Sequence, residues 1–499
     1  MMRNILLKLF LPAVCLTAAA ENLQSDYGEK WRPQYHYTPA HRWIGDPCGL
    51  VHFNGKFHAY CWGAAESDDM IHWTEINSEA IHDIPKGTSP FTGSVAIDRN
   101  NSAGYGKNAF IAAFTSFDEQ SKKQSQSIAF SHDEGRTFHY YDLNPVIDTW
   151  STEFRDPTVL WDETSGRWIM AVAKALEKKV AFYGSDDLKQ WQWLSDFGPA
   201  GDSEKSWECP DLFRLPVKGS GEKKWVLLVS VNWAREQYFT GTFDGMRFIP
   251  DSLTPQPLYV DAGLDYYASR TFQDYDGSLP GVYSLGWVST WDYAQHVPTE
   301  YGKGVWSLPR ELSLRKTAEG LRLVQEPVRN LRLLRGKQRT LSRRLKAGVM
   351  PLPAAMEMNN QYELSATFST WKNDVFGINL CTGNDRKVTL TYDVSAQTLM
   401  LDRTNASERL IPKFERMAFA KVAPDGETLN LDIFVDKSVI EVYANGGECV
   451  MTALIFPGDA DTGAEMFSLR GGNEVSLSIY PMASVWRNSS VNPIGKKKK

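Results

Sequence analysis

The feature that constrains the fold of this chain most strongly is a turn motif that recurs in its first half. Residues 67–73, 131–138 and 185–191 each carry a Ser-x-Asp turn followed by an aromatic residue, and residues 243–248 form a weaker copy. Short β-type runs lie between the copies at a spacing of roughly ten residues, and helical periodicity is nearly absent. Such a recurrence predicts the blades of a β-propeller, because a closed ring of blades leaves no long strand edge open.

The chain divides into segments of different character. Residues 31–310 have room for five blades at about 50 residues per blade, and Asn54-Gly55 between two alternating runs is a strong hairpin signal within them. Residues 311–345 are rich in Leu and Arg and are interpreted as a connecting segment. Residues 346–487 contain runs of alternating apolar and polar residues, which are typical of a two-sheet sandwich. The sequence therefore predicts an all-β protein, a five-bladed β-propeller followed by a C-terminal β-sandwich.

The N-terminus has the features of an export signal. Arg3 precedes an apolar stretch that ends in three alanines, the last of which is Ala20. A charged start, a short apolar run and small residues predict a signal peptide over residues 1–20, cleaved near Ala20. Cys15 leaves a lipid-anchored alternative open. No later stretch is apolar for long enough to span a membrane, so we expect an exported protein, periplasmic or extracellular, without a transmembrane segment after signal removal.

Composition and charge exclude several classes of protein. A hydrophobic content of 42% with 23% charged residues is typical of a globular protein. The net charge of -6 and the scattered basic residues argue against nucleic acid as a partner. The cysteines that follow the signal segment are odd in number and lack zinc-like spacing, so we expect neither a metal site nor a disulfide framework; they are Cys48, Cys61, Cys209, Cys381 and Cys449.

Three acidic residues stand in similar settings within the predicted propeller. Asp46, Asp156 and Glu208 each lie close to a proline and an aromatic residue, and each precedes an apolar run typical of an inner strand. Strand starts of different blades meet around the propeller axis, so these acids can converge without being close in sequence. Glycoside cleavage needs this arrangement, because one carboxylate attacks or stabilises the anomeric carbon while a carboxylic acid protonates the leaving oxygen. Arg155 would keep the neighbouring Asp156 ionised and oriented.

Each acid also has a purely structural interpretation. Asp46 stands before a proline, where aspartate is common in Asx turns, and Arg155 with Asp156 can form an ion pair that only stabilises the fold. The structural interpretation is weakest for Glu208, which stands between a tryptophan and a cysteine. The residues alone leave both interpretations open.

The order of the motifs resembles glycoside hydrolase family 32, the family of invertases, inulinases and levanases. The resemblance rests on three acidic motifs, at residues 43–49, 155–157 and 208–209. It covers nearly the whole mature chain in the right order, and it extends to residues 32–39, 91–94, 265–268, 286–300, 307–312, 402–404 and 439–457. The family's fold, a five-bladed propeller joined to a β-sandwich, agrees with the prediction from the repeat.

The resemblance implies a retaining mechanism that acts on fructans or fructo-oligosaccharides of the levan or inulin type. In it Asp46 forms a fructosyl-enzyme, Glu208 acts as acid and then base, and Asp156 stabilises the transition state. No metal or organic cofactor is implied. The tryptophans among the expected substrate contacts should line the pocket and stack on sugar faces. All of these contacts lie in or near the matching motifs: Trp43, Trp62, Phe91, Ser94, Arg155 and Trp291.

The sequence departs from the family pattern around the expected nucleophile. Gly45 and Cys48 stand where the family usually has Asn, and Cys61 runs almost directly into Trp62-Gly63, where the family carries a longer loop. These positions help to hold the sugar, so a sucrose-preferring invertase, a fructosyl transferase and a catalytically weak carbohydrate-binding relative stay open as alternatives. Retention of all three acids favours an enzyme. Exo or endo action, β-2,1 or β-2,6 preference and the oligomeric state are left open.

Overall fold

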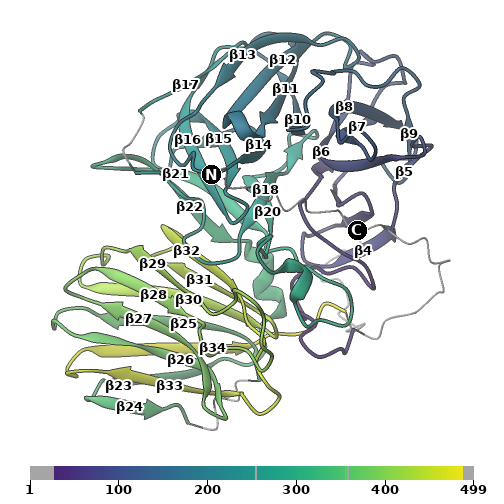
Figure 1. Cartoon of the computed structure of the whole chain (residues 1–499). Coiled ribbons are helices and arrows are strands. Elements are labelled where there is room, and N and C mark those ends of the chain that lie inside the picture. Colours follow the sequence, from purple (N-terminus) through teal and green to yellow (C-terminus); the bar gives the residue numbers. More distant parts are fainter. Residues whose placement is uncertain (1–26, 253–255, 354–355, 357–358, 487–499) are drawn as a thin grey trace, which may run out of the picture.

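The structure, a computed structural model, describes residues 27–252, 256–353, 356 and 359–486. The predicted signal peptide, residues 1–20, lies outside these ranges. The chain forms a ring of five sheets and, beside it, a sandwich of two sheets (Figure 1). The predicted all-β fold, a five-bladed β-propeller followed by a β-sandwich, is confirmed.

Each propeller blade is a sheet of four or five strands. Blade I contains β19 (Gln273–Asp274), β1 (Gly49–Phe53), β2 (Lys56–Tyr60), β3 (Ala64–Ser67) and β4 (Trp73–Asn77). Blade II contains β6 (Thr88–Asp98), β7 (Ala109–Asp118), β8 (Gln124–Ser131), β9 (Phe138–Tyr140) and β5 (Ile81–His82). Blade III contains β10 (Phe154–Asp162), β11 (Arg167–Lys174), β12 (Lys179–Ser185) and β13 (Gln192–Phe197), with the short 3-10 helix η1 (Ala175–Glu177) between β11 and β12.

The last two blades complete the ring. Blade IV contains β14 (Trp207–Pro216), β15 (Lys223–Val231), β16 (Arg235–Phe243) and β17 (Phe248–Pro250). Blade V contains β18 (Tyr267–Thr271), β20 (Val282–Trp287), β21 (Arg310–Thr317) and β22 (Gly320–Pro327), with the 3-10 helix η2 (Ala294–His296) between β20 and β21.

The recurring Ser-x-Asp motif forms the turn that leads into the fourth strand of a blade, counted from the axis. In blade I, the Asp69 carboxylate accepts hydrogen bonds from the Ser67 hydroxyl and from the backbone N–H of Ile71. Asp133 in blade II and Asp187 in blade III accept equivalent bonds in the turns before β9 and β13. The weaker fourth copy joins β16 to β17 in blade IV. Because the carboxylate satisfies backbone donors that a tight turn leaves free, the same short sequence recurs at the same place.

The ring closes through its inner strands. Around the axis, β1 contacts β6, β6 contacts β10, β10 contacts β14, β14 contacts β18, and β18 contacts β1. Strand β19, which follows β18, pairs in parallel with β1, so that Val51 lies opposite Gln273 and His52 opposite Asp274. A short strand from the chain segment of blade V thus joins the sheet of blade I, and the N-terminal ends of the inner strands are held around one axis.

The segment expected to connect the two parts, residues 311–345, belongs in large part to the propeller. Strands β21 and β22 pair with each other and with β20 to complete blade V. Leu312, Leu314 and Leu323 are buried against blade IV, because alternate residues of the two strands face the core. Residues 328–338, which include the 3-10 helix η3 (Arg329–Leu334), run between the propeller and the first sandwich strand. The Leu-rich composition thus reflects a buried strand pair.

The C-terminal part consists of two six-stranded antiparallel sheets that bury a common core. One sheet has the order β23 (Arg339–Arg344), β34 (Glu474–Pro481), β25 (Gln361–Ser369), β30 (Thr428–Asp436), β31 (Val439–Ala444) and β32 (Cys449–Leu454). The other has the order β24 (Gly348–Pro351), β33 (Gly463–Ser468), β26 (Val375–Gly383), β27 (Arg386–Asp393), β28 (Thr398–Asp402) and β29 (Met417–Lys421).

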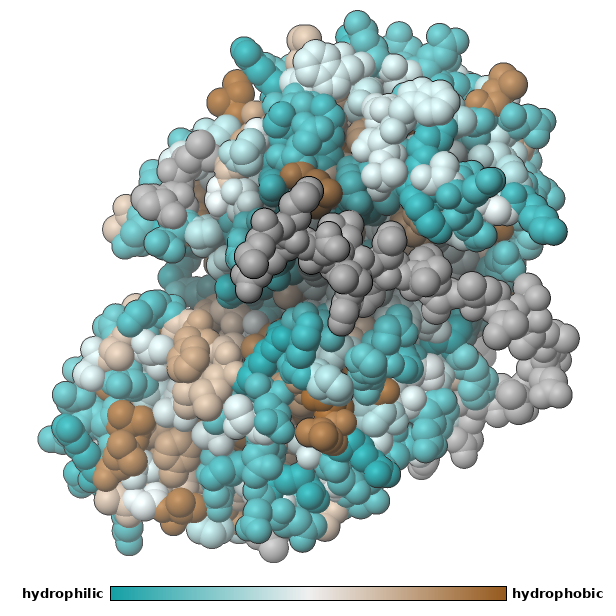
Figure 2. All heavy atoms as spheres, in the orientation of Figure 1, coloured by the Kyte–Doolittle hydropathy of each residue, from teal (hydrophilic) through white to brown (hydrophobic). Residues whose placement is uncertain are grey.

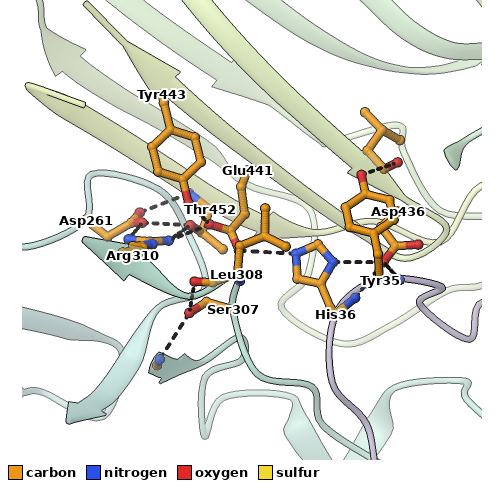
Figure 3. A network of polar contacts seen from close by, with 12 residues as sticks. Tyr35, His36, Asp261, Ser307, Leu308, Arg310, Asp436, Glu441, Tyr443 and Thr452 are labelled. Carbon is orange, nitrogen blue, oxygen red and sulfur yellow. Dashed lines mark hydrogen bonds and ion pairs between the residues drawn. The ribbon is translucent and has the colours of Figure 1, made fainter. Parts of the chain in front are cut away.

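A network of buried polar side chains joins the propeller to the sandwich (Figure 3). Arg310 of blade V lies 3.1 Å from Asp261 and 2.8 Å from Glu441 of the sandwich. His36, from the segment before blade I, lies 2.8 Å from Asp436 and 3.2 Å from Glu441. Each buried charge in this network depends on a partner from the other part of the chain, so the contacts favour one relative orientation of propeller and sandwich.

The surface shows no continuous apolar face in the view of Figure 2, where hydrophilic side chains predominate and apolar patches are small. Large exposed apolar residues such as Leu143, Trp150 and Leu410 are scattered, which is common on protein surfaces. Within the described ranges, no helix is long and apolar enough to cross a membrane.

Candidate active site

The inner strands of blades III, IV and V share a bulge near their N-terminal ends. The register shifts around Asp156 in β10, around Cys209 in β14 and around Ala268 in β18. These three residues have positive φ angles of 64°, 48° and 55°. Positive φ is uncommon for residues other than glycine, and bulges redirect side chains next to functional sites. The same bulge in three adjacent blades points to one site at this end of the axis.

The residues that precede the three bulges contact one another in a row. Arg155 Nε donates to Glu208 Oε1 at 2.9 Å, and the Tyr267 hydroxyl donates to Glu208 Oε2. Arg155 Nη1 also donates to Glu153 Oε2 at 2.7 Å. Both oxygens of Glu208 are therefore held by the blades on either side. Tyr267 was not among the predicted site residues, although aligning the three bulge sequences would have placed it beside Arg155 and Glu208.

Asp46 and Asp156 meet at Cys209. The Cys209 Sγ lies 3.6 Å from Asp46 Oδ2 and 3.5 Å from Asp156 Oδ2, and the Cys209 N–H donates to Asp156 Oδ2 at 3.1 Å. Thr92 Oγ1 donates to Asp46 Oδ2 at 2.8 Å. Asp46 Oδ1 is buried and has no hydrogen-bond partner among the residues that the structure describes. The structure thus brings all three predicted acids to one end of the propeller axis.

The acids perturb one another because they share a site with little water. Burial, together with the charges of Asp156 and Glu208, raises the pKa of Asp46 to about 7, although the hydrogen bond from the Thr92 hydroxyl lowers it in part. Burial also raises the pKa of Asp156 to about 6, against the opposing charge of Arg155. Burial therefore makes both Asp46 and Asp156 harder to ionise than exposed aspartates.

A cluster of tryptophans lies beside this site. The Trp43 and Trp291 rings stack with 5.9 Å between centroids and an interplanar angle of 19°. Trp287 meets Trp291 edge to face at 5.0 Å and lies 6.4 Å from the Tyr267 ring. The structure thus brings the predicted residues Trp43 and Trp291 together and adds Trp287. Trp291 is 42% exposed, so part of its ring is open to a ligand.

Trp62 and Phe91 are connected to the site through Thr92. Trp62 Nε1 donates to the Phe91 carbonyl at 2.7 Å, and the neighbouring Thr92 side chain holds Asp46. The Phe91 ring stacks on Phe117 with 4.5 Å between centroids. Both predicted residues therefore belong to the segment that supports the Asp46 carboxylate.

Ser94 lies in a different environment from the other predicted contacts. Its side chain is buried, and its Oγ accepts the Val159 N–H at 2.9 Å. This bond joins β6 of blade II to β10 of blade III. We therefore assign Ser94 to the packing between blades and not to substrate contact, a distinction that the motif could not make.

A cavity on the propeller rim is separate from the carboxyl cluster. Within the described part of the chain, no group of three or more His, Cys, Asp or Glu side chains is arranged to hold a metal ion. A cavity of about 590 Å³ lies on the rim of blades IV and V, where Lys218, Tyr238 and Arg322 line it. None of the three predicted acids lines this cavity, so it is separate from the candidate active site.

A five-bladed propeller with carboxyl groups at one end of its inner strands and tryptophan rings beside them is the architecture of a carbohydrate-cleaving enzyme. The chain belongs to glycosyl hydrolases family 32: the family's N-terminal domain matches residues 36–327 and its C-terminal domain matches residues 330–481. The first match ends where β22 completes blade V. The family predicted from the motifs is confirmed, and the protein is a glycoside hydrolase.

Individual relatives are similar over most of the chain. A levanase of Bacillus subtilis (strain 168) is 36% identical over 491 residues, which cover 93% of this chain and 72% of the levanase. An extracellular exo-inulinase of Aspergillus niger is 32% identical over 522 residues, which cover 92% of this chain and 96% of the relative. The crystal structure of exo-inulinase from Aspergillus awamori superimposes with a TM-score of 0.86 at 31% identity, and covers 92% of this chain and 100% of that chain.

Proposed function

We propose that the protein is a retaining hydrolase of β-fructosidic bonds in fructans or fructo-oligosaccharides. The names of its relatives, levanase and exo-inulinase, support this class of substrate. The observation that carries the proposal is that the carboxyl groups of Asp46 and Glu208 are hydrogen-bonded differently. Thr92 holds one oxygen of Asp46 and leaves the other without a partner, whereas Arg155 and Tyr267 hold both oxygens of Glu208.

In this proposal Asp46 is the nucleophile and Glu208 is the acid/base. The free Asp46 Oδ1 attacks the anomeric carbon while Glu208 gives a proton to the leaving oxygen. In the second step Glu208 takes a proton from water, which attacks the same carbon and releases fructose from Asp46. Retention requires the two carboxyl groups to lie about 5–5.5 Å apart. Arg155 and Tyr267 keep the Glu208 carboxyl in position during both proton transfers.

Asp156 is proposed as the stabiliser of the transition state. The Cys209 N–H orients one of its oxygens, and the carboxylate can accept hydrogen bonds from sugar hydroxyls. Such bonds strengthen as positive charge develops on the sugar ring. Trp43, Trp62, Phe91, Arg155 and Trp291 are the proposed substrate contacts, with the exposed part of the Trp291 ring as the surface on which a sugar face stacks.

Neutral variants of the two acids test the proposal. Reducing-sugar release is measured on inulin, levan and sucrose for the native protein and for Asp46→Asn and Glu208→Gln. We expect hydrolysis of at least one substrate by the native protein and a loss of about a thousandfold or more in each variant. The matched control is Asp68→Asn, because the Asp68 side chain is 82% exposed on the outer turn of blade I.

The products separate the remaining alternatives. Release of fructose alone indicates hydrolysis from a chain end, shorter oligosaccharides indicate internal cleavage, and longer ones indicate fructosyl transfer. If the native protein cleaves no β-fructoside and sugar binding is unchanged in both acid variants, a carbohydrate-binding role replaces this proposal.

We also propose that the protein is exported after cleavage near Ala20. The signal-like composition of residues 1–20 and the extracellular relative of Aspergillus niger support this location. N-terminal sequencing of the protein recovered outside the cytoplasm tests it, and an intact Met1 on the exported protein would refute cleavage.

A further inference from the structure

The backbone on both sides of Asp46 is held by sulfur atoms. The Gly45 N–H donates to Cys61 Sγ at 3.4 Å, and the Cys48 thiol donates to the Asp46 carbonyl at 3.3 Å. Thiols are weak donors and acceptors, but these two bonds are made to the residue proposed as nucleophile and to its neighbour. A change at either sulfur therefore acts directly on the direction of the Asp46 side chain.

The two cysteines are neighbours across the first hairpin of blade I. Strands β1 and β2 pair with Gly49 opposite Tyr60, and the Cys48 N–H donates to the Tyr60 carbonyl at 2.7 Å. Cys48 and Cys61 are the next residues on either side of this pair. Their thiols are close enough to shift each other's pKa, and a disulfide requires Cα atoms within about 7 Å of each other.

The thiols also interact with each other, and their environments differ. The neighbouring Cys48 thiol, together with the charge of Arg42, lowers the pKa of Cys61 to about 6 although burial opposes it. Burial raises the pKa of Cys48 well above its ordinary value, and the proximity of Cys61 adds to this effect. The Arg42 side chain is itself held by Glu75 at 2.8 Å. Cys61 is therefore the thiol of the pair that ionises more readily, and the thiolate is the attacking species in thiol–disulfide exchange.

We propose that Cys48 and Cys61 are positioning residues for Asp46 in their reduced form, and that joining them in a disulfide lowers turnover. This inference rests on the proposed function of Asp46. In the reduced pair, the Cys48 S–H fixes the Asp46 carbonyl while Cys61 Sγ fixes the Gly45 N–H. In the disulfide the S–H donor is gone, and the sulfur atoms approach to about 2.05 Å, which draws Cys61 away from Gly45.

The oxidation balances with a low-molecular-weight disulfide as oxidant. The Cys61 thiolate attacks one sulfur of the oxidant and releases one thiol, and the Cys48 thiolate then displaces the second thiol from the mixed disulfide. The net change is the loss of two protons and two electrons from the protein and the reduction of one disulfide to two thiols.

The test treats the whole purified protein with oxidised glutathione and follows three readouts. Peptide mapping by mass spectrometry identifies a Cys48–Cys61 disulfide, fructoside assays give kcat and KM, and thermal unfolding gives Tm. We expect the disulfide to lower kcat by about tenfold with little change in KM and no fall in Tm, and dithiothreitol to restore kcat. Positioning predicts this separation of kcat from Tm, whereas a merely structural role would lower both.

Single variants provide the matched comparison. Cys48→Ala removes the donor and should lower kcat to a similar degree, whereas Cys48→Ser keeps an O–H donor and should recover most of it. Cys449→Ser, on a strand of the sandwich, is the control and should leave kcat unchanged. Both Cys48 variants are resistant to formation of the disulfide, so oxidised glutathione should not affect them through this pair.

The outcomes are distinct. If no disulfide forms under excess oxidant, or if it forms while kcat stays the same, this inference is wrong and the proposed function stands. If the reduced native protein cleaves no β-fructoside, both fail together.

Discussion

The protein buries two clusters of carboxyl groups, one at the propeller axis and one between the propeller and the sandwich, and it provides them with different partners. At the axis, the Arg155 guanidinium contacts Glu208 and Asp156, and no ion pair is recorded for Asp46 among the described residues. At the interface, nearly every acid meets a cation of its own; the acids are Asp261, Asp265, Asp436 and Glu441, and the cations are Arg310, Arg403 and His36.

The effect of these partners on the pKa of a buried carboxyl group is clear when Asp46 is compared with Glu441. Burial raises the pKa of both Asp46 and Glu441, but Arg310 and His36 reverse the effect at Glu441 and lower its pKa to about 2. Asp46 has no such partner, and its pKa rises to about 7. Two cations therefore keep Glu441 ionised, whereas burial still raises the pKa of Asp261 and Asp265, which lie beside Arg310 and Arg403. At the axis, Asp46 has no cation in contact, among the described residues, to oppose burial.

The largest expected effect separates activity from stability at the axis. Asp46→Asn should lower kcat by about 10³–10⁵-fold, because the amide cannot form the covalent intermediate. The same change removes an uncompensated buried charge, so Tm should stay the same or rise. Calorimetry alongside the assays tests both parts, and a clear fall in Tm would show that the axis cluster is compensated after all.

The second prediction concerns the interface, where the expected effect is a loss of stability. Arg310→Met should lower the free energy of unfolding by about 3–5 kcal/mol, because Asp261 would stay buried without its cation and Glu441 would keep only His36. The matched control is Arg315→Met, which removes a half-exposed ion pair with Glu448 and should change stability by less than about 1 kcal/mol. Chemical denaturation measures both, and equal effects would contradict the comparison.

The two clusters should also respond to pH in different ranges. The pKa of His36 is raised to about 9 in the folded protein from 6.5, so its contribution to stability is complete below pH 6.5 and is lost as pH rises through about 9. The pKa of Asp46 is raised from 3.8 to about 7, so its protonated form stabilises the fold at low pH, and this contribution is lost between pH 3.8 and 7.

Measurements of Tm against pH test these ranges. The stability difference between the native protein and His36→Gln should shrink above pH 9, and the gain from Asp46→Asn should grow between pH 4 and pH 7. Over that lower range kcat/KM should rise as Asp46 ionises. A difference between the native protein and His36→Gln that stays constant up to pH 10 would contradict the assignment of charge to His36.

The smallest effect concerns Gly45. A Cβ atom at this position would lie 2.9 Å from Trp43 Nε1, so Gly45→Asn must displace the indole ring. We expect KM to change by a few-fold, about 1 kcal/mol, and the ratio of sucrose to inulin cleavage to change more than kcat on the best substrate. Gly45→Ala is the smaller matched change. If both variants leave KM unaltered, Trp43 does not contact the substrate.

The sequence predicted the parts of the fold that rest on local patterns. The Ser-x-Asp turn was visible because Asp69 and its equivalents satisfy their own neighbouring backbone donors. The strands of blade V were mistaken for a linker because Leu312 and Leu323 become a core face only when β21 pairs with β22. Ser94 was predicted as a sugar contact because its motif matched, and its bond to Val159 belongs to another blade.

The sequence by itself determined the class of the fold and the family, and it singled out three acids that the fold brings to one axis, since all of these depend on short motifs in a fixed order. Tertiary structure alone decided what surrounds each acid. Tyr267 lies beside Glu208, and Cys61 beside Gly45, because separate strands start at one axis or pair in one hairpin. Proton affinity and side-chain direction depend on burial and on neighbours distant in sequence, and these exist only once the ring has closed.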